Sequence, residues 1–212
     1  VEAHYPNIAF DVYALDHEEA GLAYAPGVEP ISVDNPAGYR AAAERINASG
    51  ADAVWLQHEY GIFGGRDGAM VTEIVDRLDV PLIVTFHTIL SQPSNGQREL
   101  LSHILRKTSL AMVMSEHGRN LLIDLYGVEP ERITIIPHGA PDRPFGRELF
   151  FKAGLGLANR PVLMTFGLLG PGKGLEHAIE ALPAIVSRHP DVLYRIVGAT
   201  HPNLVREEGE AY

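Results

Sequence analysis

Histidines stand directly after several short apolar runs of this chain, where an imidazole could bind or polarise a substrate hydroxyl. His58, His87 and His138 each follow such a run, and Ser115 and its neighbours follow a fourth. In open α/β sheets, ligands bind at the carboxyl ends of the strands, so we expect these side chains at one edge of a sheet. One histidine at such a position is more often a structural hydrogen-bonding group. Its repetition at equivalent positions favours a binding site.

A glycine-rich loop carries one of the three lysines found among the 17 Lys and Arg residues. The sequence GLLGPGKG, from Gly167 to Gly174, follows the apolar run VLMTF and precedes a helical pattern. Glycines allow close backbone approach, the amino end of a helix attracts anions, and the Lys173 ammonium would add a charge for phosphate. The loop nearly matches the pattern G-x-x-x-x-G-K-[ST], but Gly174 replaces the hydroxyl that would hold magnesium. We expect anion binding here, with a degenerate nucleotide-binding loop as an alternative.

A further loop, FGGRDG at residues 63–68, follows His58 and contains Gly64 and Gly65. Its backbone amides could approach a phosphate or a sugar closely. An ordinary turn between a strand and a helix would explain the same residues, so both interpretations stay open.

The histidines also allow a second chemistry. His58, His87 and His138, beside Glu59, could bind zinc and leave an open fourth position for water. No H-E-x-x-H helix is present, and the sequence spacing fixes none of the distances between them. A zinc enzyme is therefore the weaker interpretation, and we predict no metal site.

Short apolar runs alternate with amphipathic stretches along the chain, which indicates βαβ units. The runs are rich in Val, Ile and Leu with little alternation, as expected of parallel strands covered on both faces. We expect strands at residues 8–14, 53–57, 81–86, 110–114, 133–136, 162–166 and 192–197, and helices at 39–48, 70–78, 98–107, 116–125, 175–188 and 203–212. This order predicts an α/β fold with a Rossmann-like, doubly wound parallel sheet.

The composition is that of an acidic globular protein. At about 150 residues per domain, its 212 residues make one large domain or one and a half. A net charge of −10 argues against binding nucleic acid, because like charges repel. The absence of cysteine excludes disulfides, thiolate metal sites and cysteine nucleophiles. No apolar run approaches the roughly 20 residues of a transmembrane helix, and no signal peptide pattern is present. We expect a cytoplasmic protein without a transmembrane segment, for which peripheral membrane contact stays open.

The segment PHGAPDRPFG, residues 137–146, interrupts the strand and helix pattern with three prolines and two glycines. Such a segment forms a long functional loop or a linker. We expect a Rossmann-like domain at residues 1–140, a linker at 141–150, and the beginning of a second Rossmann-like domain at 151–212. The chain opens on Val1 and stops inside an expected helix, so we expect a fragment.

Several segments, taken in order, resemble the retaining glycosyltransferases of family 4, which have the GT-B fold. They are TFHT, SEHG, ITIIPHGAPD, MTFGLLGPGKGLEHAIEALP and RIVGA, and the resemblance covers about residues 52–212. It implies two Rossmann-like domains facing across a cleft, with the acceptor bound mainly by the first and a nucleoside diphosphate sugar mainly by the second. The implied reaction transfers a hexose with retention, without metal or cofactor, to a hydroxyl of a sugar, glycan or lipid.

The resemblance also implies roles for single residues. His87 would reach the cleft near the transferred sugar as the catalytic residue. Lys173 would bind the donor diphosphate, with Gly167 and Gly174 in the loop beside it. The acceptor side and the cleft would include His58, Gly64, Gly65, Ser115 and His138.

The chain departs from the family pattern in ways that bear on activity. Leu168 stands where the family has arginine, which removes one of two cations for the diphosphate, and His138 stands where the family has asparagine. The family's first strand is not found before Ile8, and its pair of glutamates would lie beyond Tyr212. We therefore expect the 212-residue chain alone to be inactive. A non-catalytic fragment that binds a sugar or a partner is the alternative.

Overall fold

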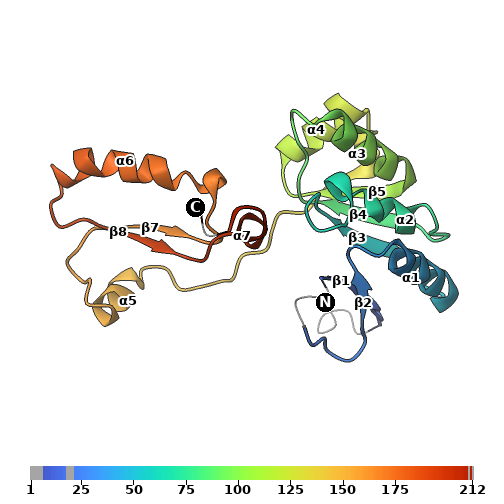
Figure 1. Cartoon of the computed structure of the whole chain (residues 1–212), viewed down its shortest axis with the longest axis horizontal. Helices are drawn as coiled ribbons and strands as arrows, with labels where there is room; N and C mark the ends of the chain where they lie inside the picture. Colours follow the sequence, from blue (N-terminus) through green and yellow to red (C-terminus); the bar gives the residue numbers. More distant parts are fainter. Residues whose placement is uncertain (1–6, 18–21, 210, 212) are drawn as a thin grey trace. The chain divides into compact units, whose positions relative to one another are not determined.

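The structure, a computed structural model, describes residues 7–17, 22–209 and 211 of the chain. The chain divides into two compact units, Val1–Ala140 and Pro141–Tyr212. Below they are called unit 1 and unit 2. Elements β1 to β6 belong to unit 1, and elements from α5 onward belong to unit 2 (Figure 1).

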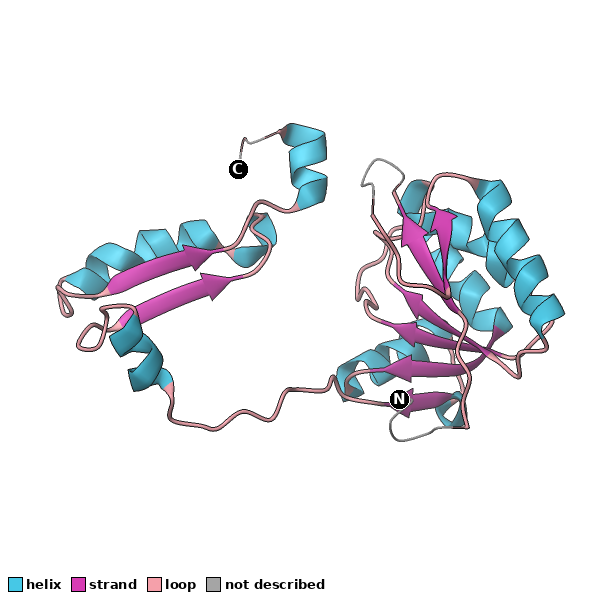
Figure 2. Cartoon of the chain, turned by 90° about the horizontal axis from the view of Figure 1, so that it is seen from below, coloured by secondary structure: helices cyan, strands magenta, loops and turns pink. Residues whose placement is uncertain are grey.

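Unit 1 contains two parallel sheets. Its strands are β1 (Val12–Asp16), β2 (Val28–Ser32), β3 (Val54–His58), β4 (Leu82–Phe86), β5 (Thr108–Val113) and β6 (Ile133–Ile135). Strands β1 and β2 pair with each other, and the second sheet has the order β3-β4-β5-β6. Because every pair in it is parallel, the carboxyl ends of these four strands lie along one edge, as the arrowheads in Figure 2 show.

The three longest helices of unit 1, α1, α3 and α4, begin where the sequence supplies a capping side chain. The helical segments of this unit are α1 (Pro36–Ser49), η2 (Arg66–Val71), α2 (Thr72–Val75), α3 (Asn95–Lys107), α4 (Glu116–Tyr126) and η3 (Pro130–Arg132). Asn35 accepts the Ala37 amide at the start of α1, and Ser94 forms a capping box with Gln97 at the start of α3. Such caps satisfy amides that have no partner inside the helix.

One face of the four-stranded sheet packs into the core of unit 1. Alternate residues of β4, Leu82, Val84 and Phe86, are at most 2% exposed and pack with Leu101 and Ile104 of α3. The other face carries a different set of side chains. Trp55 there donates its indole N–H to Thr85 Oγ1 at 2.8 Å. The alternation of strand side chains thus decides which residues meet the helices.

Unit 2 is built on one parallel strand pair. Its elements are α5 (Glu148–Gly154), β7 (Val162–Phe166), η4 (Pro171–Lys173), α6 (Leu175–Val186), β8 (Leu193–Val197) and α7 (Pro202–Glu208). Strand β7 pairs with β8, and backbone hydrogen bonds from Gly167 to Val197 and from Leu169 to Ala199 continue the pairing beyond the strands. A Cβ on Gly198 would stand 1.8 Å from the Gly167 carbonyl oxygen, so only glycine fits there.

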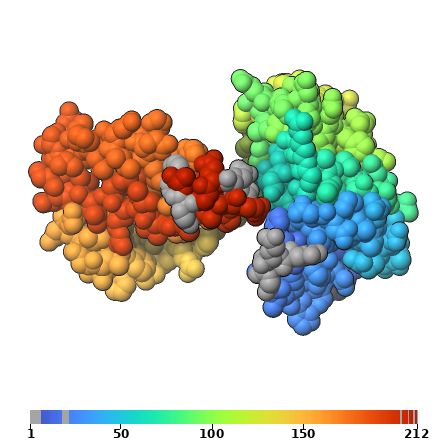
Figure 3. Space-filling model, in the orientation of Figure 1, coloured from blue at the N-terminus to red at the C-terminus, as the bar shows by residue number. Residues whose placement is uncertain are grey.

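Many apolar side chains of unit 2 are exposed. Phe166 of β7 is 73% exposed and Phe150 of α5 is 70% exposed. The atoms of unit 2 are coloured from yellow-orange to red in the space-filling view (Figure 3). Unit 1, in contrast, contains nearly all the buried apolar residues of the described chain.

The α/β class and the parallel sheet predicted from the sequence are confirmed, and several element bounds were wrong. The strand expected at residues 8–14 begins only at Val12. Strand β2 was missed because Pro30 lies inside it, which an edge strand tolerates. The helix expected at 203–212 ends at Glu208, and residues 210 and 212 lie outside the described part.

Two helix predictions also needed correction. The helix expected at 70–78 is two short pieces, and α2 ends at Val75. Asn47 explains this end, because its side chain donates to the Arg77 carbonyl and accepts the Asp79 amide, which holds the following chain out of a helix. Helix α5 was not predicted, and it begins at Glu148, inside the segment expected as linker.

Candidate functional site

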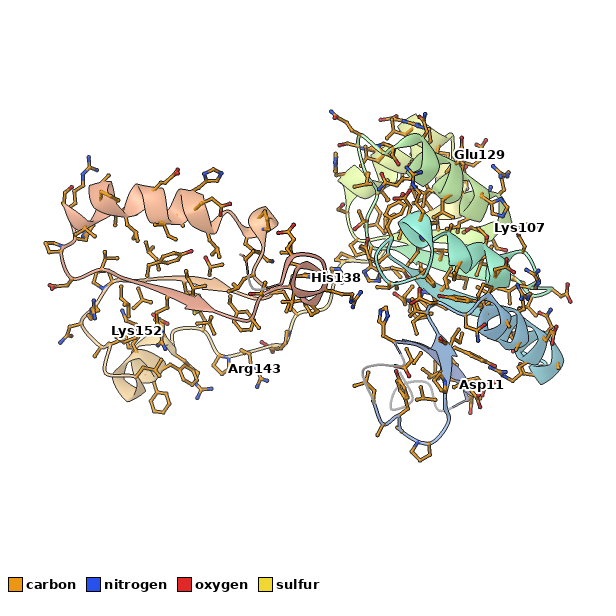
Figure 4. The ribbon with its side chains drawn as sticks, viewed as in Figure 1. Asp11, Lys107, Glu129, His138, Arg143 and Lys152 are labelled. Carbon is orange, nitrogen blue, oxygen red and sulfur yellow. The ribbon has the colours of Figure 1, made fainter. Side chains whose placement is uncertain are left out.

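The carboxyl edge of the main sheet brings His87 and His138 together. Their rings stack with centroids 5.9 Å apart and 26° between their planes, and both side chains are exposed. His138 lies at the margin of unit 1 where the chain leaves β6, whereas Lys107 and Glu129 lie at the opposite end of the unit (Figure 4). Two imidazoles that follow different strands therefore share one surface.

Gln57 at the end of β3 orients His87. The Nε2 atom of His87 is 2.9 Å from Gln57 Oε1, and the His87 amide donates to the His58 carbonyl at 3.0 Å. An amide oxygen only accepts hydrogen bonds, so Nε2 carries the proton, and Nδ1 of the neutral ring holds a lone pair. Sequence reasoning missed Gln57, although it precedes His58 at the same strand end.

Glu59 supports the segment that follows β4. Its Oε2 accepts the Thr88 hydroxyl at 2.5 Å, and its Oε1 accepts the Tyr60 amide at 2.9 Å. Both carboxylate oxygens are therefore engaged by the protein itself. This arrangement ties the loop after β3 to the residue next to His87.

His58 lies in the core and not at the open surface. Its ring is 1% exposed and packs among Tyr60, Phe63 and Phe86, with centroid distances of 5.1, 6.0 and 5.6 Å. Neither ring nitrogen has a hydrogen-bond partner among the described residues. Burial lowers the pKa of His58 to about 4, Glu59 opposes that change, and His87 adds to it. The ring is therefore neutral at pH 7, and its surroundings leave no path to a ligand at this edge.

The Gly64 and Gly65 loop is explained by packing. A Cβ on Gly64 would stand 2.1 Å from the Val33 carbonyl oxygen, and the Gly64 amide donates to the Tyr39 hydroxyl at 3.3 Å. That hydroxyl in turn donates to the Val33 carbonyl at 2.9 Å. The buried Gly64 amide thus has a protein partner, while Gly65 is exposed.

A hollow of about 270 Å³ lies beside His87, between the ends of β4 and β5 and the first turns of α4. Ser115 is the N-cap of α4, and its Oγ accepts the Gly118 amide at 3.1 Å. The lining residues are Phe86, His87, Thr88, Ile89, Val113, Met114, Ser115, His117, Gly118 and Leu121. The hollow therefore joins two of the residues expected from the sequence, His87 and Ser115.

The three histidines proposed as zinc ligands do not form one ligand set. His58 is enclosed by aromatic rings, whereas His87 and His138 stack at the surface. Within residues 7–17, 22–209 and 211, no group of three or more His, Asp or Glu side chains could hold a metal ion. The zinc interpretation therefore has no geometric basis in the described part of the chain.

In unit 2, the Lys173 side chain lies against the loop that begins at Gly167. Its Nζ is 3.8 Å from the position that a Cβ on Gly167 would occupy. Lys173 ends η4, and Gly174, in the left-handed conformation, is the N-cap of α6 without a side-chain hydrogen bond. Lys173 is exposed and forms no ion pair with the described residues. Lys173 thus lies two residues before the start of α6, while Leu168 is exposed and adds no charge.

The chain shares its sequence pattern with a known protein family. The model of Glycosyltransferase Family 4 matches residues 10–143, more than half of the chain. The chain belongs to glycosyltransferase family 4. The matched residues include the whole edge with Gln57, His87, Ser115 and His138.

Curated relatives of the chain are also glycosyltransferases. A D-inositol 3-phosphate glycosyltransferase of Acidothermus cellulolyticus is 27% identical over 147 residues, which cover 63% of this chain and 32% of that protein. The protein of the same name from Rhodococcus erythropolis is 29% identical over 163 residues, with 70% of this chain and 36% of that protein covered. The chain thus spans about a third of the length of these relatives.

Solved structures of the GT-B type share the fold. Anabaena HepE in complex with UDP has a TM-score of 0.58 and 21% identity, with 85% of this chain and 50% of that chain covered. UDP-GlcNAc 2-epimerase from Methanocaldococcus jannaschii has a TM-score of 0.53 and 14% identity, with 97% and 62% covered. Because an epimerase also has this fold, the fold by itself does not decide the reaction. Within the described residues, every helix is too short or too polar to span a lipid bilayer.

Proposed function

We propose that the chain serves the transfer of a hexose from a nucleoside diphosphate sugar to an acceptor hydroxyl. The observation that carries this proposal is the Lys173 ammonium beside the Gly167 loop at the start of α6, in a chain of glycosyltransferase family 4. HepE in complex with UDP, whose fold this chain shares, supports a nucleoside diphosphate as the ligand. The cytoplasm stays our predicted location.

The donor diphosphate is assigned to unit 2. Backbone amides at the amino end of a helix carry a partial positive charge and favour the binding of an anion, so we expect the start of α6 to attract the diphosphate. Lys173 adds a full charge there without a competing ion pair among the described residues. Gly167 leaves room for the Lys173 side chain and for a close approach of the diphosphate, and Gly174 is the N-cap of α6.

The acceptor is assigned to the carboxyl edge of unit 1. His87, His138 and Ser115 present polar groups at that edge, and Gln57 fixes the ring of His87. With its proton on Nε2, His87 would accept a hydrogen bond from a sugar hydroxyl through Nδ1 and so orient it. Gly64, Gly65 and His58 would act behind this edge, by shaping the loops that support it.

In the proposed mechanism, the bond from the sugar to the diphosphate breaks as the acceptor oxygen forms its bond on the same face of the sugar, which retains the configuration. Negative charge builds up on the departing diphosphate. Donors aimed at that charge contribute most of the catalysis, and Lys173 with the α6 amides would supply them without a metal ion. The acceptor proton leaves with the departing diphosphate.

A second candidate is a sugar- or partner-binding fragment without turnover. The exposed Leu168 favours it, since the loop then has one cation and not two for the diphosphate. The two candidates differ in whether nucleoside diphosphate binds.

The test compares Lys173→Ala with Lys152→Ala, which removes a lysine from α5 of the same unit. UDP and GDP binding would be measured by calorimetry, and consumption of a panel of nucleotide sugars by release of the diphosphate. We expect loss of the Lys173 ammonium to weaken nucleotide binding or turnover of the nucleotide sugar roughly 100- to 1000-fold. The Lys152 variant should behave as the parent does. Parental affinity and turnover in Lys173→Ala would refute the donor assignment. Sugar binding without any nucleotide binding would favour the second candidate.

A further inference from the structure

We propose that the hollow beside His87 selects acceptors that carry a small apolar group next to the reacting hydroxyl. This inference rests on the proposed glycosyl transfer and narrows its acceptor class. The hollow is the feature that distinguishes this edge from a flat polar surface, and its lining decides what can enter it.

The floor of the hollow is apolar. Phe86 and Val113, at the ends of β4 and β5, line the hollow and are each 1% exposed. Ile89, Met114 and Leu121 are half-buried around them. A sugar without an apolar group would leave this floor hydrated, whereas an apolar group would displace that water.

The rim of the hollow is polar. His87, Ser115 and His117 are exposed and border the opening. The inner hydroxyl, on Thr88, already donates to Glu59, so it does not require a ligand hydroxyl as partner. Polar groups at the rim and apolar groups within define the orientation of a ligand, with its hydroxyl near His87 and its apolar group inside.

Gly118 on the first turn of α4 keeps the floor open. A Cβ at this position would stand 3.3 Å from Ile89 Cδ1 and 3.5 Å from Val113 Cβ. The Ser115 hydroxyl oxygen lies 3.6 Å from the same position. The space above Gly118 is thus bounded by two aliphatic carbons and one hydroxyl, and a single methyl group would narrow it. Glycine is less favourable than alanine in a helix, so the open space at this position is kept against helix propensity.

The size of the hollow limits the apolar group. An apolar cavity of about 150 Å³ accommodates benzene, and this hollow measures about 270 Å³. It therefore accepts one ring or a short alkyl chain. A long lipid chain would extend out of it, so the acceptor class is an aryl or short-alkyl polyol or glycoside.

The test measures the binding of methyl, hexyl and phenyl β-glucoside to the 212-residue chain by calorimetry and by NMR. We expect hexyl and phenyl glucoside to bind at least tenfold more tightly than methyl glucoside, since each methylene buried from water is worth about fourfold. The methyl resonances of Ile89 and Met114 should shift on binding. Equal affinities for the three glucosides, or shifts confined to other regions, would overturn the proposal.

Gly118→Ala and Asn120→Ala form a matched pair of variants on the same helix. The alanine methyl at 118 should weaken phenyl glucoside binding at least threefold, while its helix propensity keeps the protein folded. Asn120 is exposed outside the lining, so its variant should bind as the parent does. Parental binding by Gly118→Ala would contradict the assignment of the hollow.

UDP binding, measured on the same samples, separates the two proposals. If UDP binds through Lys173 while the three glucosides bind alike, the acceptor class is wrong and the transferase proposal stands. If UDP and nucleotide sugars do not bind, the transferase proposal fails whatever the glucosides do.

Discussion

Acidification should destabilise unit 1 through His58, and His58→Phe should remove that effect. The ring is 1% exposed, and neither of its nitrogens has a hydrogen-bond partner among the described residues. Burial lowers the pKa of His58 from 6.5 to about 4. Phenylalanine would keep the ring contacts with Tyr60, Phe63 and Phe86 and would remove two buried polar atoms.

The magnitude follows from the two pKa values. Above pH 6.5 the His58 ring is neutral in both the folded and the unfolded chain, so the buried ring contributes fully to the free energy of unfolding. Between pH 6.5 and pH 4 the unfolded chain binds a proton that the folded chain excludes, so the free energy of unfolding falls by up to about 1.4 kcal/mol per pH unit. The total loss is about 3 kcal/mol at pH 4.

The assay is urea unfolding followed by the fluorescence of Trp55, the one tryptophan of the chain, which lies on β3 of unit 1. The free energy of unfolding of the parent minus that of His58→Phe should fall by about 3 kcal/mol from pH 7.5 to pH 4. At pH 7.5 the variant should be at least as stable as the parent. An equal pH dependence in both proteins, or an NMR titration of folded His58 near its ordinary pKa of 6.5, would refute the reasoning.

Two further substitutions probe the segments that support the edge. Gly64→Ala should lower the free energy of unfolding by about 1–3 kcal/mol, because its Cβ would stand 2.1 Å from the Val33 carbonyl oxygen. The control Gly61→Ala should change the free energy of unfolding little, because no atom lies within 4 Å of the Cβ position at Gly61. Equal unfolding midpoints in urea for the two variants would contradict this packing. Gln57→Ala should release His87 from the Nε2-protonated tautomer, which ¹⁵N shifts of the ring would detect; an unchanged tautomer ratio would show that Gln57 does not orient the ring.

Much of the fold followed from local sequence. Strand β7 has the bounds predicted for it, 162–166, because its apolar run is closed by proline before it and glycine after it. Strand β2 could not be read from its residues, since VEPIS has a central proline and gains its order by pairing with β1. Helix α5 was hidden by the prolines and glycines that precede it.

The sequence alone determined the parallel α/β order, the glycine-rich loop with Lys173, and the motif order that indicated glycosyltransferase family 4. These features depend on neighbouring residues and on spacing. Only the tertiary structure decided which histidines face solvent. His58 and His87 both follow apolar runs, but His58 takes the alternate position that faces the core, where Tyr60 and Phe63 enclose it. His87 lies one residue past β4 and turns to Gln57 of the neighbouring strand. Burial depends on contacts between distant segments, and no local pattern contains them.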